Sequence, residues 1–126
     1  MPVPPKLEKE IEGLRTEYNL EVIEDSDFIN LVFRDFPLGE LFSVPSSKLL
    51  LRVPKIYPEA GPDMFYTDPT VRLANGELPK NTESVETYVG ANWRRFSWHR
   101  QQPWHPIADN MHSCIEFIRR RLRKNE

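Results

Sequence analysis

The sequence LEVIEDSDFINLVFR, residues 20–34, decides the fold class of this chain. Its two parts, Leu20–Asp25 and Phe28–Arg34, are short and rich in β-branched and aromatic residues, and a polar Asp-Ser-Asp run at 25–27 separates them. This pattern is typical of a β-hairpin. The sequence therefore predicts that an antiparallel sheet begins with these residues.

Further strands follow the hairpin. A loop through Pro37, Leu38 and Gly39 leads to a possible strand at residues 40–44. The run from Ser47 to Val53 indicates another strand, ended by Pro54. We predict an antiparallel meander of three or four strands.

A helix is predicted before the meander, over Pro5 to Tyr18. Its apolar residues recur at the spacing of one helical face, namely Leu7, Ile11, Leu14 and Tyr18. Proline at position 5 suits a helix start, where its missing N–H costs nothing. The opposite face, which carries Lys6 and Glu10 among other charged residues, should be solvated.

A second helix is predicted over Pro106 to Lys124. Its apolar positions at helical spacing are Ile107, Met111, Cys114 or Ile115, Ile118 and Leu122. Asp109 falls in the expected first turn, and the basic residues 119–124 fill the last turns, so both ends match the helix dipole. We expect this basic end to be solvated.

Between the meander and the second helix, residues 56–92 hold prolines and glycines that forbid any long regular element. Aromatic and aliphatic residues make this segment too apolar for a free linker, so it should be ordered, extended and packed on the sheet. The order helix, meander, extended segment, helix predicts an α+β fold in a single domain over residues 1–126.

Charge and composition exclude several classes of function. The chain has 17 basic and 19 acidic residues, and this near-balance argues against a nucleic-acid binder. Its sequence holds neither an apolar run of the ~18 residues that a membrane span needs nor a signal peptide. We expect a cytoplasmic protein with no membrane partner.

The sequence has one cysteine, Cys114, which excludes an intramolecular disulfide and a cysteine-rich zinc site. It could be a nucleophile, or a small apolar residue on the inner face of the second helix. His112 points about 160° round the helix axis from it and gives it no local activation. We therefore predict that Cys114 is buried and unreactive.

No motif indicates a metal or another cofactor, and we expect neither. The three histidines, His99, His105 and His112, lack the short spacing of a ligand motif, and the glycines form no phosphate loop. His105 should be exposed or capping. His99 follows the aromatic and basic run that begins at Trp93; it is either part of a packing cluster or a site residue beside Ser97.

Several motifs resemble one known family. They are Tyr57-Pro58, the run Pro62 to Tyr66, Trp93 followed by Phe-Ser-x-His at 96–99, and Trp104 ahead of the last helix. Together they resemble prokaryotic family E of the ubiquitin-conjugating enzyme (UBC) superfamily, over roughly residues 20–123. The resemblance implies the UBC fold.

The resemblance also implies a role in bacterial ubiquitin-like conjugation. The expected partners are a ubiquitin-like protein, an activating enzyme of the ubiquitin type and a JAB-type peptidase. A conjugating enzyme of this superfamily takes the partner's carboxyl terminus onto a cysteine as a thioester and passes it to an amine.

The sequence departs from that pattern at the cysteine. The family resemblance places the cysteine after His-Pro-Asn and upstream of Trp104, yet residues 94–102 contain neither feature. Three alternatives follow: binding without catalysis, an unusual transfer through His99 or Ser97, or chemistry at Cys114. A fourth alternative is an adaptor with no link to ubiquitin-like proteins.

We predict a site around His99, because a histidine titrates near neutral pH and suits general base work. Asp63 would orient His99, and Cys114 is the last choice for catalysis. The residues expected to contact the partner are Tyr57, Arg94, Arg95, Trp98 and Trp104. The two arginines would hold its carboxyl terminus.

Overall fold

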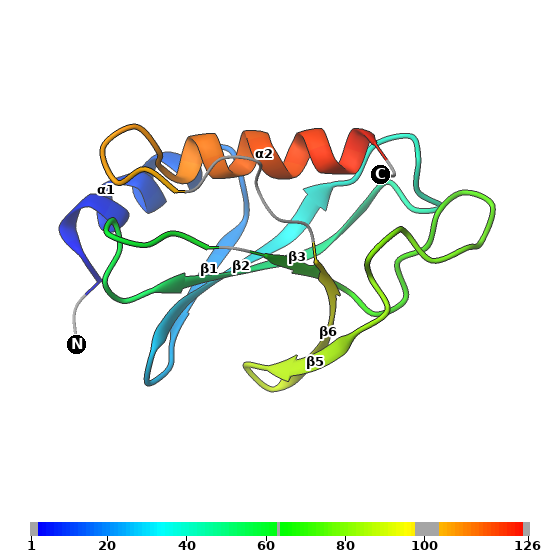
Figure 1. Cartoon of the computed structure of the whole chain (residues 1–126), viewed down its shortest axis with the longest axis horizontal. Coiled ribbons are helices and arrows are strands. Elements are labelled where there is room, and N and C mark those ends of the chain that lie inside the picture. The colour runs from blue at the N-terminus through cyan, green and yellow to red at the C-terminus, as the bar shows by residue number, and fades with distance from the viewer. Residues whose placement is uncertain (1–2, 63, 98–103, 125–126) are drawn as a thin grey trace.

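An antiparallel sheet with two helices on one face forms the molecule (Figure 1). A computed structural model describes residues 3–62, 64–97 and 104–124. The elements in chain order are α1 (Pro5–Leu14), β1 (Leu20–Glu24), β2 (Phe28–Pro37), β3 (Ser46–Pro54), β4 (Phe65–Thr67), β5 (Val85–Tyr88), β6 (Ala91–Phe96) and α2 (Met111–Arg123). The strand order across the sheet is β1-β2-β3-β4-β6-β5. The predicted α+β class is confirmed, and the arrangement is consistent with a UBC fold.

The β1–β2 hairpin forms as predicted, and Asp25 stabilises its turn. One carboxylate oxygen of Asp25 accepts hydrogen bonds from the main-chain N–H groups of Asp27 at 3.1 Å and Phe28 at 2.8 Å. Strand β2 runs beyond the predicted end at Arg34, because the pairing with β3 resumes after an irregularity between Phe33 and Phe36. The turn chemistry thus sets the register of the first two strands.

The predicted strand at residues 40–44 is wrong. Phe42 makes only an isolated bridge, to Leu73, and lies in the connection between β2 and β3. Gly39, at φ +91°, turns the chain away from the direction of β2. Phe42 itself is buried, so its apolar character serves the core without a strand.

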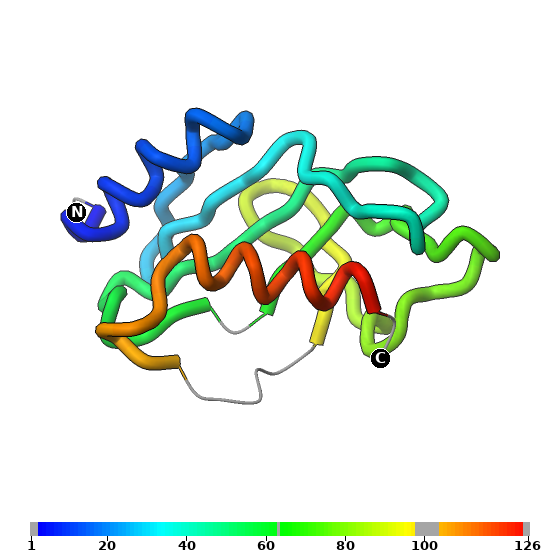
Figure 2. Tube along the Cα trace, turned by 90° about the horizontal axis from the view of Figure 1, so that it is seen from above, coloured from blue at the N-terminus to red at the C-terminus, as the bar shows by residue number. Residues whose placement is uncertain are grey.

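The proline-rich segment 56–92 does more than pack on the sheet. It contributes β4, β5 and the first two residues of β6 to the sheet. Its path, from green to yellow, can be followed in Figure 2. Each of these strands is short, as the prolines and glycines require. The prediction of an ordered segment holds, but its strands were missed.

Both helices are shorter than their predicted ranges. Helix α1 ends at Leu14, and Tyr18 leaves the helical face to stack on Phe36 and to meet Phe33 edge-on. Helix α2 begins at Met111, because Asn110 and Ser113 form a reciprocal capping box there. Asp109 therefore precedes the helix instead of lying in its first turn.

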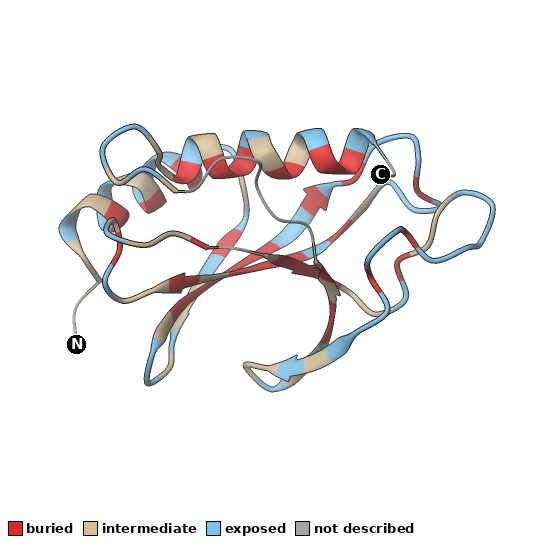
Figure 3. Ribbon diagram, viewed as in Figure 1, coloured by how far each residue is buried: buried red, intermediate tan, exposed pale blue. Residues whose placement is uncertain are grey.

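The main core lies between the helices and the sheet (Figure 3). Leu7, Ile11 and Leu14 of α1 and the apolar face of α2 cover aromatic side chains of the sheet. A second, smaller cluster lies apart from it, formed by Val32, Leu50, Tyr66 and Trp93. In β6, Trp93 belongs to the small cluster and Phe96 to the main core, so the two clusters lie on opposite faces of the sheet.

The basic end of α2 is not wholly solvated, which corrects the prediction. Arg121 is 1% exposed and lies over the ring of Phe96, at 5.3 Å from the centroid. Its guanidinium donates to the carbonyl oxygens of Lys124 at 3.0 Å and Lys80 at 2.5 Å. Arg121 thereby fastens the end of α2 to the segment before β5.

Val89 occupies a strained position in the β5–β6 turn. Tyr88 pairs with Ala91, so Val89 and Gly90 form a two-residue turn in which both φ angles are positive, at 45° and 77°. Glycine and asparagine adopt such angles readily, whereas a β-branched residue does so at a cost of ~1 kcal/mol or more.

We expect Val89→Asn to raise the free energy of unfolding by about 1 kcal/mol, because asparagine tolerates a positive φ. Urea unfolding measures the change. Val85→Asn is the matched control, since Val85 is exposed in β5 of the same hairpin, and it should leave stability unchanged or lower it slightly. Equal effects of the two substitutions would show that Val89 is unstrained.

Candidate functional site

Tyr57 and Trp104, two of the predicted site residues, lie together at one end of the helices. Their rings are 5.7 Å apart between centroids and tilted by 53°. The indole N–H of Trp104 donates to the carbonyl oxygen of Pro58 at 2.8 Å. Gly61 lies directly against the indole, because a Cβ built there would be 2.3 Å from a Trp104 ring carbon. The Tyr57–Pro58 motif and the tryptophan before α2 thus form one packed unit.

Helix α1 supplies two charged residues to this unit. Glu10 accepts a hydrogen bond from the Tyr57 hydroxyl, and the same oxygen accepts from the main-chain N–H of Met111 at 3.1 Å. Lys6 donates to the carbonyl oxygens of Pro106 at 3.2 Å and Asp109 at 3.3 Å, and its ammonium lies 5.8 Å from the centre of the Tyr57 ring. We call Lys6, Glu10, Tyr57 and Trp104 the α1–Trp104 cluster.

The roles of Lys6 and Glu10 were missed from the sequence. Both were assigned to the solvated face of α1, but both are only partly exposed. Lys6 binds the segment before α2, and Glu10 binds the first residue of α2. Their spacing of one helical turn is common on any exposed helix face. The sequence therefore carries no signal that separates them from the other charged residues of α1.

Tyr57 is a hydrogen-bond donor in this cluster. Burial, and then the hydrogen bond and the charge of Glu10, raise the pKa of its hydroxyl far above the ordinary value. The side chain is 3% exposed, whereas Trp104 is partly exposed. Tyr57 therefore supports Trp104 from inside the molecule.

The three remaining aromatic and acid–base candidates lie outside the described residues: Asp63, Trp98 and His99. Their neighbour Ser97 is held at the end of β6. Its N–H donates to the carbonyl oxygen of Asn81 at 2.9 Å, and its hydroxyl accepts from Arg95 at 2.8 Å. The roles of Asp63, Trp98 and His99 stay predictions.

Arg94 and Arg95 point to opposite faces of the sheet, because neighbouring residues of a strand alternate. Arg95 pairs with Glu86 at 2.8 Å and is about one-third exposed. Arg94 is 7% exposed and donates to the carbonyl oxygens of Pro69 at 3.0 Å and Thr82 at 2.6 Å. One carboxyl terminus cannot be held by both arginines in this arrangement.

Cys114 is buried, as predicted. It is 3% exposed and belongs to the main core, among the apolar residues with which α2 covers the sheet. His112 is exposed on the same helix. His105 is exposed, as one of its two predicted alternatives has it. It accepts hydrogen bonds at Nδ1 from the N–H groups of Ile107 and Ala108 in the turn before α2, whereas Asn110 caps the helix itself.

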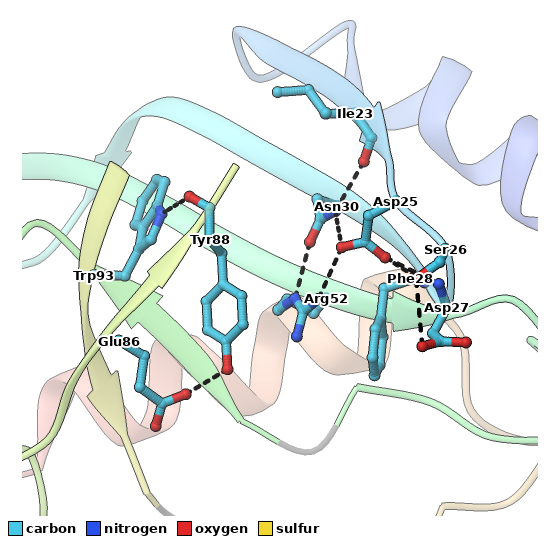
Figure 4. A network of polar contacts seen from close by, with 10 residues as sticks. All are labelled: Ile23, Asp25, Ser26, Asp27, Phe28, Asn30, Arg52, Glu86, Tyr88 and Trp93. Carbon is cyan, nitrogen blue, oxygen red and sulfur yellow. Dashed lines mark hydrogen bonds and ion pairs between the residues drawn. The ribbon is translucent and has the colours of Figure 1, made fainter. Parts of the chain in front are cut away.

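A polar network occupies the sheet face opposite the helices (Figure 4). Arg52 donates to Asn30 at 3.1 Å and to Asp25 at 2.8 Å. Its guanidinium lies 4.2 Å from the ring centre of Phe28 and 3.9 Å from that of Tyr88. Arg52 thus joins the β1–β2 turn to the β5–β6 hairpin across the sheet.

The network also changes the pKa values of two of its side chains, Asp25 and Tyr88. Burial raises the pKa of the Asp25 carboxyl, but the hydrogen bonds from Asn30, Arg52 and the main-chain N–H groups of Phe28 and Asp27 outweigh burial and hold that pKa well below its usual range. The hydrogen bond to Glu86, and then burial, raise the pKa of the Tyr88 hydroxyl. Asp25 is therefore charged and Tyr88 neutral at physiological pH.

Comparison with known protein families decides the family. The model of prokaryotic E2 family E matches residues 8–125. The chain belongs to prokaryotic E2 family E. No curated protein and no solved structure matches this family E chain. The family resemblance drawn from the sequence is confirmed, and the match takes in most of α1 as well as the predicted range.

Within residues 3–62, 64–97 and 104–124 of this family E chain, no three side chains of the metal-binding types His, Cys, Asp and Glu come together as a possible metal site. No helix in the same ranges has the length and apolar character to cross a membrane.

We expect Gly61→Ala to lower the free energy of unfolding of the family E chain by roughly 1–3 kcal/mol, because the new methyl group overlaps Trp104. Gly13→Ala is the matched control. Its Cβ would lie 4.0 Å from His112, an ordinary contact, near the end of α1, so it should raise stability by about 0.5–1 kcal/mol. Thermal and urea unfolding measure both, and a Gly61→Ala variant as stable as the wild type would contradict the packing.

We expect Asp25→Asn to lower the free energy of unfolding by roughly 1 kcal/mol near pH 7, with allowance for the partial exposure of the carboxylate. Because the folded pKa lies below the unfolded value of about 3.9, the stabilisation is full above that pH and is lost as the pH falls below it. The two stability curves should therefore converge below about pH 4. Exposed Asp27→Asn is the control, and curves that stay parallel down to about pH 2 would exclude this role of Asp25.

Proposed function

We propose that this chain binds a ubiquitin-like protein in a bacterial conjugation pathway and forms no thioester at Cys114. Membership of a prokaryotic E2 family supports the first part, since an E2 protein acts with ubiquitin-like partners. The other expected partners are an activating enzyme of the ubiquitin type and a JAB-type peptidase. The whole chain would act as one UBC-type domain in the cytoplasm, where ATP drives activation.

The burial of Cys114 carries the second part. A thiolate that accepts a carboxyl terminus must reach the carbonyl carbon of a second protein, and so must be partly exposed. Cys114 is 3% exposed and lies among apolar residues, which disfavour the charged thiolate. It is also the chain's only cysteine.

The partner-binding site in this proposal centres on His99, with Trp98 and Trp104 beside it. Of these three, Trp104 lies within the described residues, where its indole N–H donates a hydrogen bond to the carbonyl oxygen of Pro58. Arg95 is the arginine that suits a partner's carboxylate, since it is the more exposed of the pair.

If the chain transfers its partner, His99 would act as the base. It would take the proton from an amine that attacks the carboxyl group held as a thioester on the activating enzyme, so that an amide bond forms as the carbon–sulfur bond breaks and the activating enzyme's thiolate leaves. Asp63 would orient the imidazole. A second candidate function is a non-catalytic interaction or scaffold module on the same fold. The burial of Cys114 favours this second function, because a domain that only binds its partner needs no exposed cysteine.

The test is a conjugation assay with the activating enzyme, ATP and the ubiquitin-like protein. Intact mass and non-reducing gels compare the wild type with Cys114→Ala and His99→Ala. We expect direct binding of the ubiquitin-like protein and no thiol-labile adduct in any variant. Exposed His112→Ala is the matched control for His99→Ala.

The outcomes separate the alternatives. An adduct that survives Cys114→Ala but is lost in His99→Ala would establish transfer through His99. Binding with no adduct would establish the non-catalytic module. A thiol-labile adduct lost only in Cys114→Ala, or no binding of the ubiquitin-like protein, would overturn the proposal.

A further inference from the structure

Two arginine side chains meet at a single carbonyl oxygen on the helix-covered side of the sheet. Arg94 of β6 donates from Nε to the carbonyl oxygen of Pro69 at 3.0 Å. Arg72 donates from Nη1 to the same oxygen at 2.9 Å, and from the same nitrogen to the carbonyl oxygen of Val71 at 2.9 Å. Two positive charges therefore lie side by side.

No carboxylate within the described ranges neutralises this pair. The ion pairs found there engage Arg34, Arg52 and Arg95. Arg72 and Arg94 bond only to main-chain carbonyl oxygens among those residues. A carbonyl dipole satisfies a hydrogen-bond donor, but it does not cancel a unit charge.

Burial makes the unmatched charge costly. Arg94 is 7% exposed, so its guanidinium has lost most of its hydration. Burial, and then the charge of Arg72, lower the pKa of Arg94. An anion beside the two guanidinium groups would offset both effects.

The two guanidinium groups also have N–H donors that could bind an anion. Among the described residues, Nη2 of Arg94 and Nε and Nη2 of Arg72 make no hydrogen bond. Arg72 is partly exposed, so a ligand from solution can reach the pair. Guanidinium groups bind phosphate and carboxylate oxygens through paired N–H donors.

We propose that Arg72 and Arg94 form a binding site for an oxyanion, a phosphate or a carboxylate group. The connection that carries Arg72, between β4 and β5, lies at the opposite end of the molecule from the loop that precedes α2 (Figure 1). The site is thus separate from the α1–Trp104 cluster. It does not depend on the proposed binding of a ubiquitin-like protein.

The experiment is calorimetric titration of the full chain with inorganic phosphate and, separately, with acetate, at constant ionic strength. We expect saturable binding of one anion per chain. Arg72→Gln should weaken it about tenfold or more, because one guanidinium is lost while buried Arg94 stays in place. Arg34→Gln is the matched control, since exposed Arg34 lies in β2, pairs with Glu21 and should keep wild-type affinity.

The two anions distinguish the sources of the oxyanion. Saturation by phosphate alone would assign a phosphate group, and saturation by acetate would assign a carboxylate. If Arg72→Gln folds poorly, Arg94→Lys gives a second test. This substitution keeps the positive charge but loses the paired N–H donors, so it should also weaken anion binding. Absence of saturable binding, or equal weakening by Arg72→Gln and Arg34→Gln, would overturn the proposal.

Discussion

The carboxylate of Glu10 is the contact on which the arrangement of the helices depends. It accepts from the Tyr57 hydroxyl and from the main-chain N–H of Met111, and so joins α1, the connection after β3 and the first turn of α2. A helix N-terminus carries unsatisfied N–H groups and a partial positive charge, which an acidic side chain stabilises. Apolar packing holds the helices on the sheet and the Asn110–Ser113 capping box sets where α2 begins, while Glu10 ties the first turn of α2 to α1.

Local chemistry explains which elements were predictable from the sequence. The β1–β2 hairpin depends on Asp25, which caps its own turn, and the two helical faces depend on apolar periodicity within single segments. Strands β4 and β5 were missed because three or four residues are too few to show a period. The opposite error occurred at Phe42, where a strand was predicted that does not form, because a buried aromatic residue in a loop resembles part of a strand in sequence.

The site was predictable only in part, for a related reason. Tyr57 and Trp104 were expected to lie together on the strength of a family resemblance, and they do. Arg94 and Arg95 were treated as one basic patch, because residues 91–96 were not identified as a strand, in which neighbours alternate between faces. Nothing in the sequence indicates that Arg121 and Arg94 are buried, because each side chain is held by carbonyl oxygens of residues far away in the chain.

Contacts between residues 6–18 and residues 106–119 can form only after about 100 further residues have been made. Lys6 to Pro106, Glu10 to Met111 and Tyr18 to Arg119 each join residues 100 or 101 positions apart. During synthesis the strands β1, β2 and β3 leave the ribosome early and can pair with one another, because their contacts are local. Helix α1 emerges before these strands, yet Lys6 binds Pro106 and Glu10 binds Met111, about 100 positions further along the chain. Until α2 has been made, Lys6 and Glu10 lack their partners in and before that helix, and the apolar face of the sheet that α2 covers is exposed. A chain that has released β1, β2 and β3 but not α2 therefore exposes apolar side chains of these strands that the helix buries in the finished protein.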